Sequence, residues 1–214
     1  AQGAYIGHWI AKTYAGKKFA VIHDKSAYGK GLATIAEKTA ADDGLKAILT
    51  EGLNPGEKDY MAVVSKLKAS GADVVYFGGY HTEAGLIRRQ AADLGYKFDL
   101  VMGDSLATPE YWTIAGPAGE NTWFTFPADP RRSPTAAAAV EEFKKQKFEP
   151  EGFTLFSYAV VQAVAAGIER AGSESPAKVA AALKDGKPFE TVVGAIALDK
   201  KGDILDPRFD INKW

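Results

Sequence analysis

The sequence contains no cysteine, which excludes disulfide bonds, thiol catalysis and zinc sites built on cysteine. This absence does not fix the cellular compartment. No apolar run approaches the ~20 residues that a membrane-spanning helix needs. The formal net charge is −1, so nothing in the charge balance favours nucleic acid or an anionic membrane as a partner.

Familiar catalytic and cofactor motifs are also missing. The segment Gly29-Lys30-Gly31 lacks the third glycine and the distal acid of a dinucleotide fingerprint. There is no P-loop and no Gly-x-Ser-x-Gly elbow, and the histidines lack metal-ligand spacing. We therefore expect no cofactor, no metal and no enzymatic activity.

Short apolar runs alternate with amphipathic segments over the first 126 residues. The runs predict strands at 19–22, 46–50, 74–77, 100–103 and 121–126. The apolar periodicity predicts helices at 3–15, 28–42, 58–70 and 82–94. This alternation with short links predicts a doubly wound, mostly parallel α/β sheet.

The pattern changes after Pro127. A linker-like stretch at 128–134 precedes three predicted helices at 135–147, 153–171 and 176–184. Two strands, 192–198 and 208–213, follow with a turn at 199–202. The middle helix carries an apolar face that needs a sheet to cover it, formed by Leu155, Tyr158, Val161, Ala165 and Ile168. The chain is thus expected to hold one complete α/β lobe and an incomplete second lobe.

Polar side chains follow three of the predicted strands. Tyr28, Tyr80 and Asp104 each come just after a strand, and in an open parallel sheet ligands bind outside those strand ends. Two phenols and a carboxylate suit a small polar molecule with a cationic group. The alternative for Tyr28 is packing at the start of a helix, and the alternative for Asp104 is a helix N-cap.

Several segments together resemble the leucine/isoleucine/valine-binding protein family. These are type I periplasmic solute-binding proteins of branched-chain amino acid ABC transporters. The resemblance lies in residues 20–25, 28–32, 52–60, 78–85, 89–91, 114–116, 158–163 and 199–203.

The resemblance implies two α/β lobes that close on a solute. On that map residues 1–127 and 192–214 form the ligand-binding second lobe, and 128–191 form the helical return segment of the first lobe. The opening part of the first lobe, which grips the ligand carboxylate, is expected to be absent before Ala1. If so, the exposed helices should promote self-association or a segment swap.

The resemblance also implies roles for four residues. Tyr28 and Tyr80 correspond to aromatics of the cleft, Asp104 to the acid that pairs with the ligand ammonium, and Phe153 to an apolar contact with the ligand side chain. Because Asp104 stands where a glutamate also occurs in the family, its shorter reach leaves room for a bulkier ligand.

We therefore expect a periplasmic protein that binds an amino acid and delivers it to a membrane ABC permease. One alternative is the ligand-binding domain of a sensory receptor with the same fold. A second, from another class, is an α/β enzyme that uses Asp24 or Asp104 as acid or base.

Overall fold

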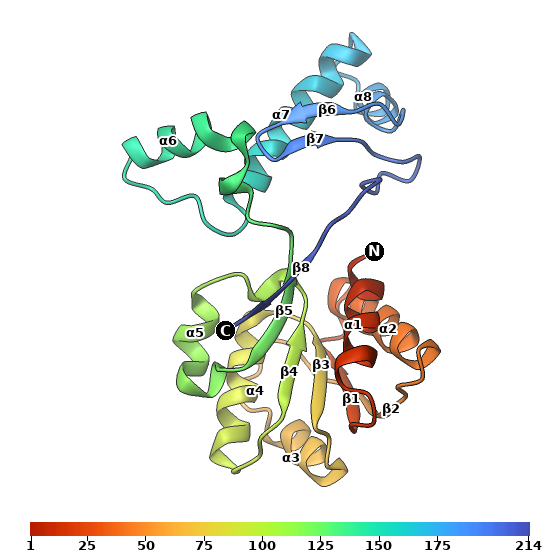
Figure 1. The fold of residues 1–214 in the computed structure, drawn as a ribbon, viewed down its shortest axis with the longest axis vertical. Coiled ribbons are helices and arrows are strands. Elements are labelled where there is room, and N and C mark those ends of the chain that lie inside the picture. Colours follow the sequence, from red (N-terminus) through yellow and green to blue (C-terminus); the bar gives the residue numbers. More distant parts are fainter. The chain divides into compact units, whose positions relative to one another are not determined.

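Contacts between residues divide the chain into two units in the computed structural model, which describes residues 1–214. Unit 1 comprises residues 1–126 and 209–214, and unit 2 comprises residues 127–208 (Figure 1). The expected lobes divide the C-terminal residues differently, because residues 192–208 group here with unit 2. The assignment of 1–127 with 192–214 and of 128–191 to family lobes stays a prediction.

A six-stranded sheet with the order β2-β1-β3-β4-β5-β8 forms the centre of unit 1 (Figure 1). Its strands are β1 (Phe19–His23), β2 (Ala47–Gly52), β3 (Val74–Gly78), β4 (Asp99–Met102), β5 (Thr122–Phe126) and β8 (Asp210–Lys213). All neighbouring pairs are parallel except β5 and β8. The expected mostly parallel sheet is confirmed.

Helices cover both faces of this sheet. They are α1 (Gln2–Thr13), α2 (Ala27–Asp42), α3 (Met61–Ser70), α4 (His81–Asp93) and α5 (Glu110–Ala115), with short 3-10 turns η1 (Asp104–Leu106) and η2 (Gly116–Gly119). Strand β3 shows why both faces are apolar: Val74 and Tyr76 pack in the cluster with α1 and α2, while Val75 and Phe77 pack in the cluster with α3, α4 and α5. This alternation follows the two-residue period of a strand and gives the doubly wound arrangement.

Helix α3 begins three residues later than the apolar periodicity predicts. The Asp59 side chain accepts a hydrogen bond from the backbone amide of Met61, at 2.8 Å. The backbone amide of Tyr60 donates to the side chain of Gln90, at 2.7 Å. These local contacts hold 58–60 outside the helix, because aspartate side chains offer the backbone an alternative to helical bonding.

Unit 2 contains helices and a two-stranded sheet. Its elements are η3 (Pro130–Arg132), η4 (Pro134–Ala136), α6 (Ala137–Lys145), α7 (Thr154–Ala171), α8 (Pro176–Leu183), β6 (Phe189–Thr191) and β7 (Gly194–Ile196). Strands β6 and β7 form an antiparallel hairpin, so the strand predicted over 192–198 is present but limited to 194–196, and β6 was not predicted. Residues 192 and 193 form the turn of this hairpin instead. No helix of either unit is long and apolar enough to cross a membrane.

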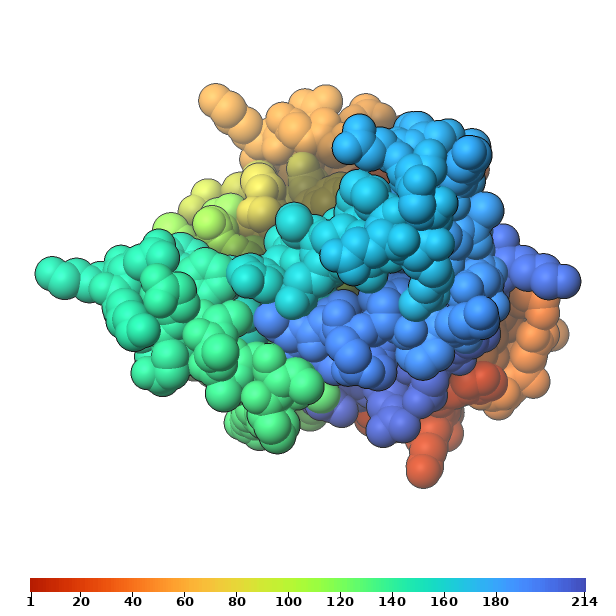
Figure 2. Space-filling model, turned by 90° about the horizontal axis from the view of Figure 1, so that it is seen from above, coloured from red at the N-terminus to blue at the C-terminus, as the bar shows by residue number.

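One side of α7 is apolar and exposed. Tyr158, Val161 and Ile168 lie on this side, with 45%, 70% and 36% of their surface exposed. Figure 2 shows α7 and α8, in cyan to blue, next to each other on the surface of unit 2. Leu155, which was expected on the same face, is buried with Val140 in a small core, and that part of the prediction is wrong.

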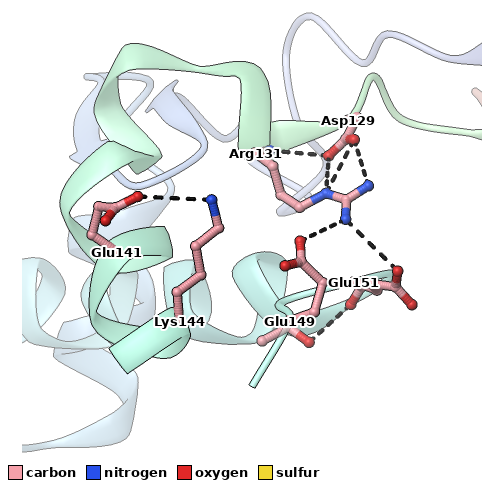
Figure 3. A network of polar contacts seen from close by, with 7 residues as sticks. Asp129, Arg131, Glu141, Lys144, Glu149 and Glu151 are labelled. Atoms are coloured by element: carbon pink, nitrogen blue, oxygen red, sulfur yellow. Dashed lines mark hydrogen bonds and ion pairs between the residues drawn. The ribbon is translucent and has the colours of Figure 1, made fainter. Parts of the chain in front are cut away.

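A cluster of charges holds the start of unit 2 against the loop before α7 (Figure 3). The guanidinium of Arg131 pairs with Asp129 at 2.8 Å, with Glu149 at 2.9 Å and with Glu151 at 3.9 Å. The hydrogen bonds from Arg131 lower the pKa of the Asp129 carboxyl below its ordinary value. The loop that leads into α7 is therefore anchored to the first residues of the unit.

Replacing Asp129 by asparagine is expected to lower stability only at pH values where Asp129 is ionised. Because the folded-state pKa is lowered, the stabilisation by this carboxylate is present above the unfolded pKa of about 3.9 and is lost as the pH falls through the lower folded value. The effect at pH 7 should be about 1 kcal/mol or less, since such surface pairs are screened. Urea unfolding followed by circular dichroism at pH 7 and pH 3 measures this, and an equal difference at both pH values would contradict it.

Candidate functional site

The candidate site lies at the carboxyl ends of the parallel strands of unit 1. Strand order reverses between β1 and β3, because the chain continues from β1 to β2 on one side and from β3 to β4 on the other. Ligands of open α/β sheets bind at such a switch point. Tyr28 follows β1, Tyr80 follows β3 and Asp104 follows β4, so all three surround this position.

The turn between β1 and α2 is fixed by Asp24 and Ser26. Oδ1 of Asp24 accepts hydrogen bonds from the backbone amide and the hydroxyl of Ser26, at 2.9 and 2.7 Å. The Ser26 hydroxyl in turn accepts from the backbone amide of Gly29, at 2.8 Å, and caps α2. This chain of bonds holds Tyr28 in the first turn of the helix. Asp24 itself is buried, with 1% of its surface exposed.

Tyr80 lies directly before α4, on the other side of the switch point. Its ring centroid is 5.2 Å from that of Tyr28, and the two planes are inclined by 34°. The backbone before it is held by the Ser105 hydroxyl, which donates to the carbonyl of Gly79 at 2.7 Å. Tyr80 is 46% exposed, so its ring offers an accessible wall beside the more buried Tyr28.

The carboxylate of Asp104 lies against the Tyr28 hydroxyl. That hydroxyl donates to Oδ1 of Asp104 at 2.8 Å, and no side-chain cap bond marks the start of η1. The carboxylate therefore contacts other elements rather than capping a helix. No lysine, arginine or histidine forms an ion pair with it. A half-buried carboxylate without a cation attracts a positively charged ligand group.

Burial and the neighbouring Asp104 raise the pKa of the Tyr28 hydroxyl above its ordinary value. Tyr28 consequently stays protonated at neutral pH and acts as a hydrogen-bond donor to the carboxylate. It is not available as a base. The arrangement suits binding of a cation and contains no activated nucleophile among these residues.

Two further residues complete this polar cluster, and sequence reasoning missed both. The side-chain amide of Gln2 donates to Oδ1 of Asp104 at 3.1 Å and to the hydroxyl of Thr125 at 2.9 Å. Gln2 begins α1 and Thr125 lies near the end of β5. They are separated from their partners by more than a hundred residues, so no local motif reveals the contacts.

A third phenol lies beneath the cluster. Tyr76 of β3 is fully buried, and its hydroxyl has no hydrogen-bond partner in the protein. Burial raises its pKa, and the charges of Tyr28 and Asp104 raise it further, so the hydroxyl stays neutral. A buried polar group without a partner is destabilising by about 1–3 kcal/mol.

Replacing Tyr76 by phenylalanine is therefore expected to leave the free energy of unfolding unchanged or to raise it by up to about 1 kcal/mol. Tyr111→Phe is the matched control, because that buried hydroxyl contacts the hydroxyl of Thr122 at 2.6 Å. Its loss should lower the unfolding free energy by about 1 kcal/mol. All tryptophans lie in unit 1, so urea unfolding followed by their fluorescence reports this unit. Equal losses in the two variants would contradict the expectation.

Phe153, the fourth predicted site residue, lies in unit 2 at the start of α7. Its side chain is 46% exposed. The preceding loop is tied to Arg131 through Glu149, as described above. Its role as an apolar contact to a ligand stays a prediction, as do the ligand-binding roles of Tyr28, Tyr80 and Asp104.

A hollow of about 740 Å³ lies elsewhere on unit 1, near the first residues of β3 and β4. Its lining includes Asp73, Asp99 and Arg88. The Arg88 guanidinium already donates to the carbonyls of Phe98, Ala118 and Glu120. None of the predicted site residues lines this hollow, so it is separate from the cluster around Asp104.

Comparison with known proteins gives consistent similarities. The periplasmic binding protein family model matches residues 1–206. Leu/Ile/Val-binding protein homolog 1 of Brucella suis is 47% identical over 213 residues, covering 100% of this chain and 57% of that protein. An amino acid binding protein of Pseudomonas aeruginosa is 44% identical over 215 residues, again covering 100% and 57%.

This chain is also similar to solved structures of binding proteins. The crystal structure of a leucine binding protein from Thermotoga maritima superposes with a TM-score of 0.87 at 28% identity. It covers 100% of this chain and 61% of that one. The chain thus spans about 57% of the length of the curated relatives quoted above.

Proposed function

Because this chain belongs to the periplasmic binding protein family, we propose that it binds an amino acid through its amino group outside the cytoplasm, for delivery to a membrane ABC permease. The predicted resemblance to leucine/isoleucine/valine-binding proteins is confirmed by the 47% identical relative from Brucella suis. The names of these relatives favour an aliphatic amino acid as the ligand.

One observation carries the proposal. Asp104 presents a carboxylate with no cationic partner beside the hydroxyl of Tyr28, whose ring packs against that of Tyr80 at the switch point of the sheet. An ammonium group of an amino acid would supply the missing positive charge. Desolvation of that pair favours ligands with an amino group over ligands without one, so it provides specificity more than affinity.

The same residues argue against the enzymatic alternative. Asp24 is buried and its Oδ1 is engaged by Ser26, so it holds the turn before α2. The phenol beside Asp104 has a raised pKa and donates its proton in a hydrogen bond. We therefore propose that the protein binds its ligand without converting it.

The test is direct measurement of binding by the gene product that contains this chain. Native mass spectrometry detects a co-purified amino acid, and calorimetry with L-leucine, L-isoleucine and L-valine measures affinity. The analogue 4-methylpentanoate, which is leucine without its amino group, should bind at least about tenfold more weakly than L-leucine, equivalent to ~1.4 kcal/mol. Absence of binding to every proteinogenic amino acid would refute the proposal.

Self-association through α7 is a further part of this proposal. The exposed apolar side of α7 includes Val160 and Val161, at 62% and 70% exposure, and large apolar patches mark interaction or aggregation sites. We expect residues 1–214 expressed alone to self-associate. Val161→Lys should shift the chain toward monomer in analytical ultracentrifugation, whereas Ala181→Lys on the exposed surface of α8 should not. A monomeric unsubstituted chain at about 100 μM would contradict this, since the contacts would then be weaker than about 5 kcal/mol.

A further inference from the structure

Glycines bring α1 unusually close to α2. A side-chain carbon at Gly3 would lie 2.9 Å from Cβ of Ile35, and one at Gly7 would lie 2.7 Å from the carbonyl oxygen of Ala36. Real Cβ atoms do not approach so closely, so the two positions admit only glycine at this helix spacing. Gln2, the first residue of α1, and Tyr28, in the first turn of α2, both reach the carboxylate of Asp104 from this closely packed helix pair.

The amide of Gln2 joins the 3-10 turn η1, which follows β4, to strand β5. Both contacts, to Oδ1 of Asp104 and to Oγ1 of Thr125, come from its nitrogen, which carries two hydrogens. Thr125 is fully buried in β5. The hydrogen bond to Thr125 fixes the position of the Gln2 amide nitrogen, and this nitrogen in turn fixes Asp104.

Both protein donors use the same oxygen of Asp104. Oδ1 accepts from Tyr28 and from Gln2, and no protein hydrogen bond occupies Oδ2. Two donors from different helices on one oxygen fix the rotation of the carboxylate. Oδ2 is then the oxygen that remains for a ligand ammonium.

We infer that Gln2 is a positioning residue that orients the Asp104 carboxylate toward the ligand amino group. The inference rests on the proposed function. A carboxylate that is already oriented in the free protein loses less conformational entropy when the ligand binds. Gln2 should therefore contribute to affinity without contacting the ligand.

Two substitutions separate positioning from simple packing of α1. Gln2→Ala removes both hydrogen bonds and should weaken L-leucine binding about tenfold, as expected for a loss of ~1.4 kcal/mol. Gln2→Glu keeps the size of the side chain but sets a second carboxyl group against Asp104, so one proton is shared between the two acids.

The distinguishing measurement is the pH dependence of affinity. The titratable groups that face Asp104 in the native protein are Tyr28 of α2 and Tyr76 of β3, and both stay neutral. Native affinity for L-leucine should therefore be flat between about pH 5 and 8, because neither phenol changes its charge in this range. In Gln2→Glu the affinity should rise with pH across this range, as the shared proton is lost.

Gln146→Glu, at the exposed C-terminal end of α6, is the matched control for charge and should show flat affinity. If native protein binds L-leucine and Asp104→Ala does not, but both Gln2 variants bind with native affinity and a flat pH profile, the inference on Gln2 is overturned while the proposed function stands. If native protein binds no amino acid, the proposed function itself fails, and the inference with it.

Discussion

Replacing Asp104 by alanine is expected to weaken amino acid binding by about 2–5 kcal/mol, the usual effect of removing one partner of a desolvated charge pair. In the native structure the carboxylate has no cationic partner and is oriented by Tyr28 and Gln2. Its removal leaves a bound ammonium without its counter-charge. Calorimetry with L-leucine on the full gene product measures the loss.

Two controls separate the charge from the shape of the site. Asp104→Asn keeps the size of the side chain but removes the charge, and should weaken binding nearly as much. Binding of 4-methylpentanoate, which has no amino group, should not weaken in either variant. A change in the dissociation constant for L-leucine of less than about threefold, or under ~0.7 kcal/mol, would rule out Asp104 as the ammonium partner.

Gly29→Ala is expected to lower the unfolding free energy of unit 1 by about 2–4 kcal/mol, combining overpacking with a weakened helix cap. A side-chain carbon at this position would overlap Oδ1 of Asp24 and the carbonyl oxygen of Gly78. The backbone amide of the same residue donates to the Ser26 hydroxyl that caps α2. A shift here also moves Tyr28, so ligand affinity should fall together with stability.

Gly31→Ala, two residues further along α2, is the matched control. Nothing lies within 4 Å of a side-chain carbon at that position. Because alanine is the better helix former, this variant should be more stable than the native protein by up to about 1 kcal/mol. Urea unfolding followed by tryptophan fluorescence compares the two, and similar behaviour of both variants would show that the close contact at Gly29 is relieved at little cost.

The sheet and its helices could be predicted because their signals are local. Strand β3 is apolar on both faces, and Gly71 lies just beyond α3 in a left-handed conformation, as its position in the sequence indicates. Strand β6 was missed, because its short sequence follows Lys187-Pro188, which is typical of a loop. Leu155 was wrongly grouped with the exposed residues of α7. Both Leu155 and Val161 are apolar, so the sequence does not reveal that α6 covers Leu155 and leaves Val161 exposed.

The candidate site was predictable only in part, because some of its contacts join residues far apart in the sequence. The positions of Tyr28, Tyr80 and Asp104 after strands determine that they meet at one edge of a parallel sheet. The contact of Gln2 with Asp104 depends on how closely α1 and α2 pack, and this spacing becomes evident only when the helices are placed. Gly3 and Gly7, spaced four residues apart on one helix, are the signal that could have indicated it.

The antiparallel pair β5–β8 makes unit 2 an insertion between two neighbouring strands of unit 1. Phe126 and Asp210 stand opposite each other in the ladder, and they lie at either end of the segment that forms unit 2. The chain therefore departs from unit 1 and returns to it at adjacent points, as in a β-hairpin whose loop has been expanded into a second body. Joining such neighbours through a two-residue turn matches the shortest natural hairpins.

Excision of residues 127–209 and their replacement by a short Asn-Gly turn would thus convert an inserted body into an ordinary hairpin loop. The closure of a short loop also carries a smaller entropic penalty than that of a long one. During synthesis of the native chain, β8 emerges after unit 2, and Trp214 then donates its indole hydrogen to the carbonyl of Leu106 at 3.1 Å. The native chain can therefore add β8 to the sheet only after residues 127–208 have been made, whereas the shortened chain would add it directly after β5.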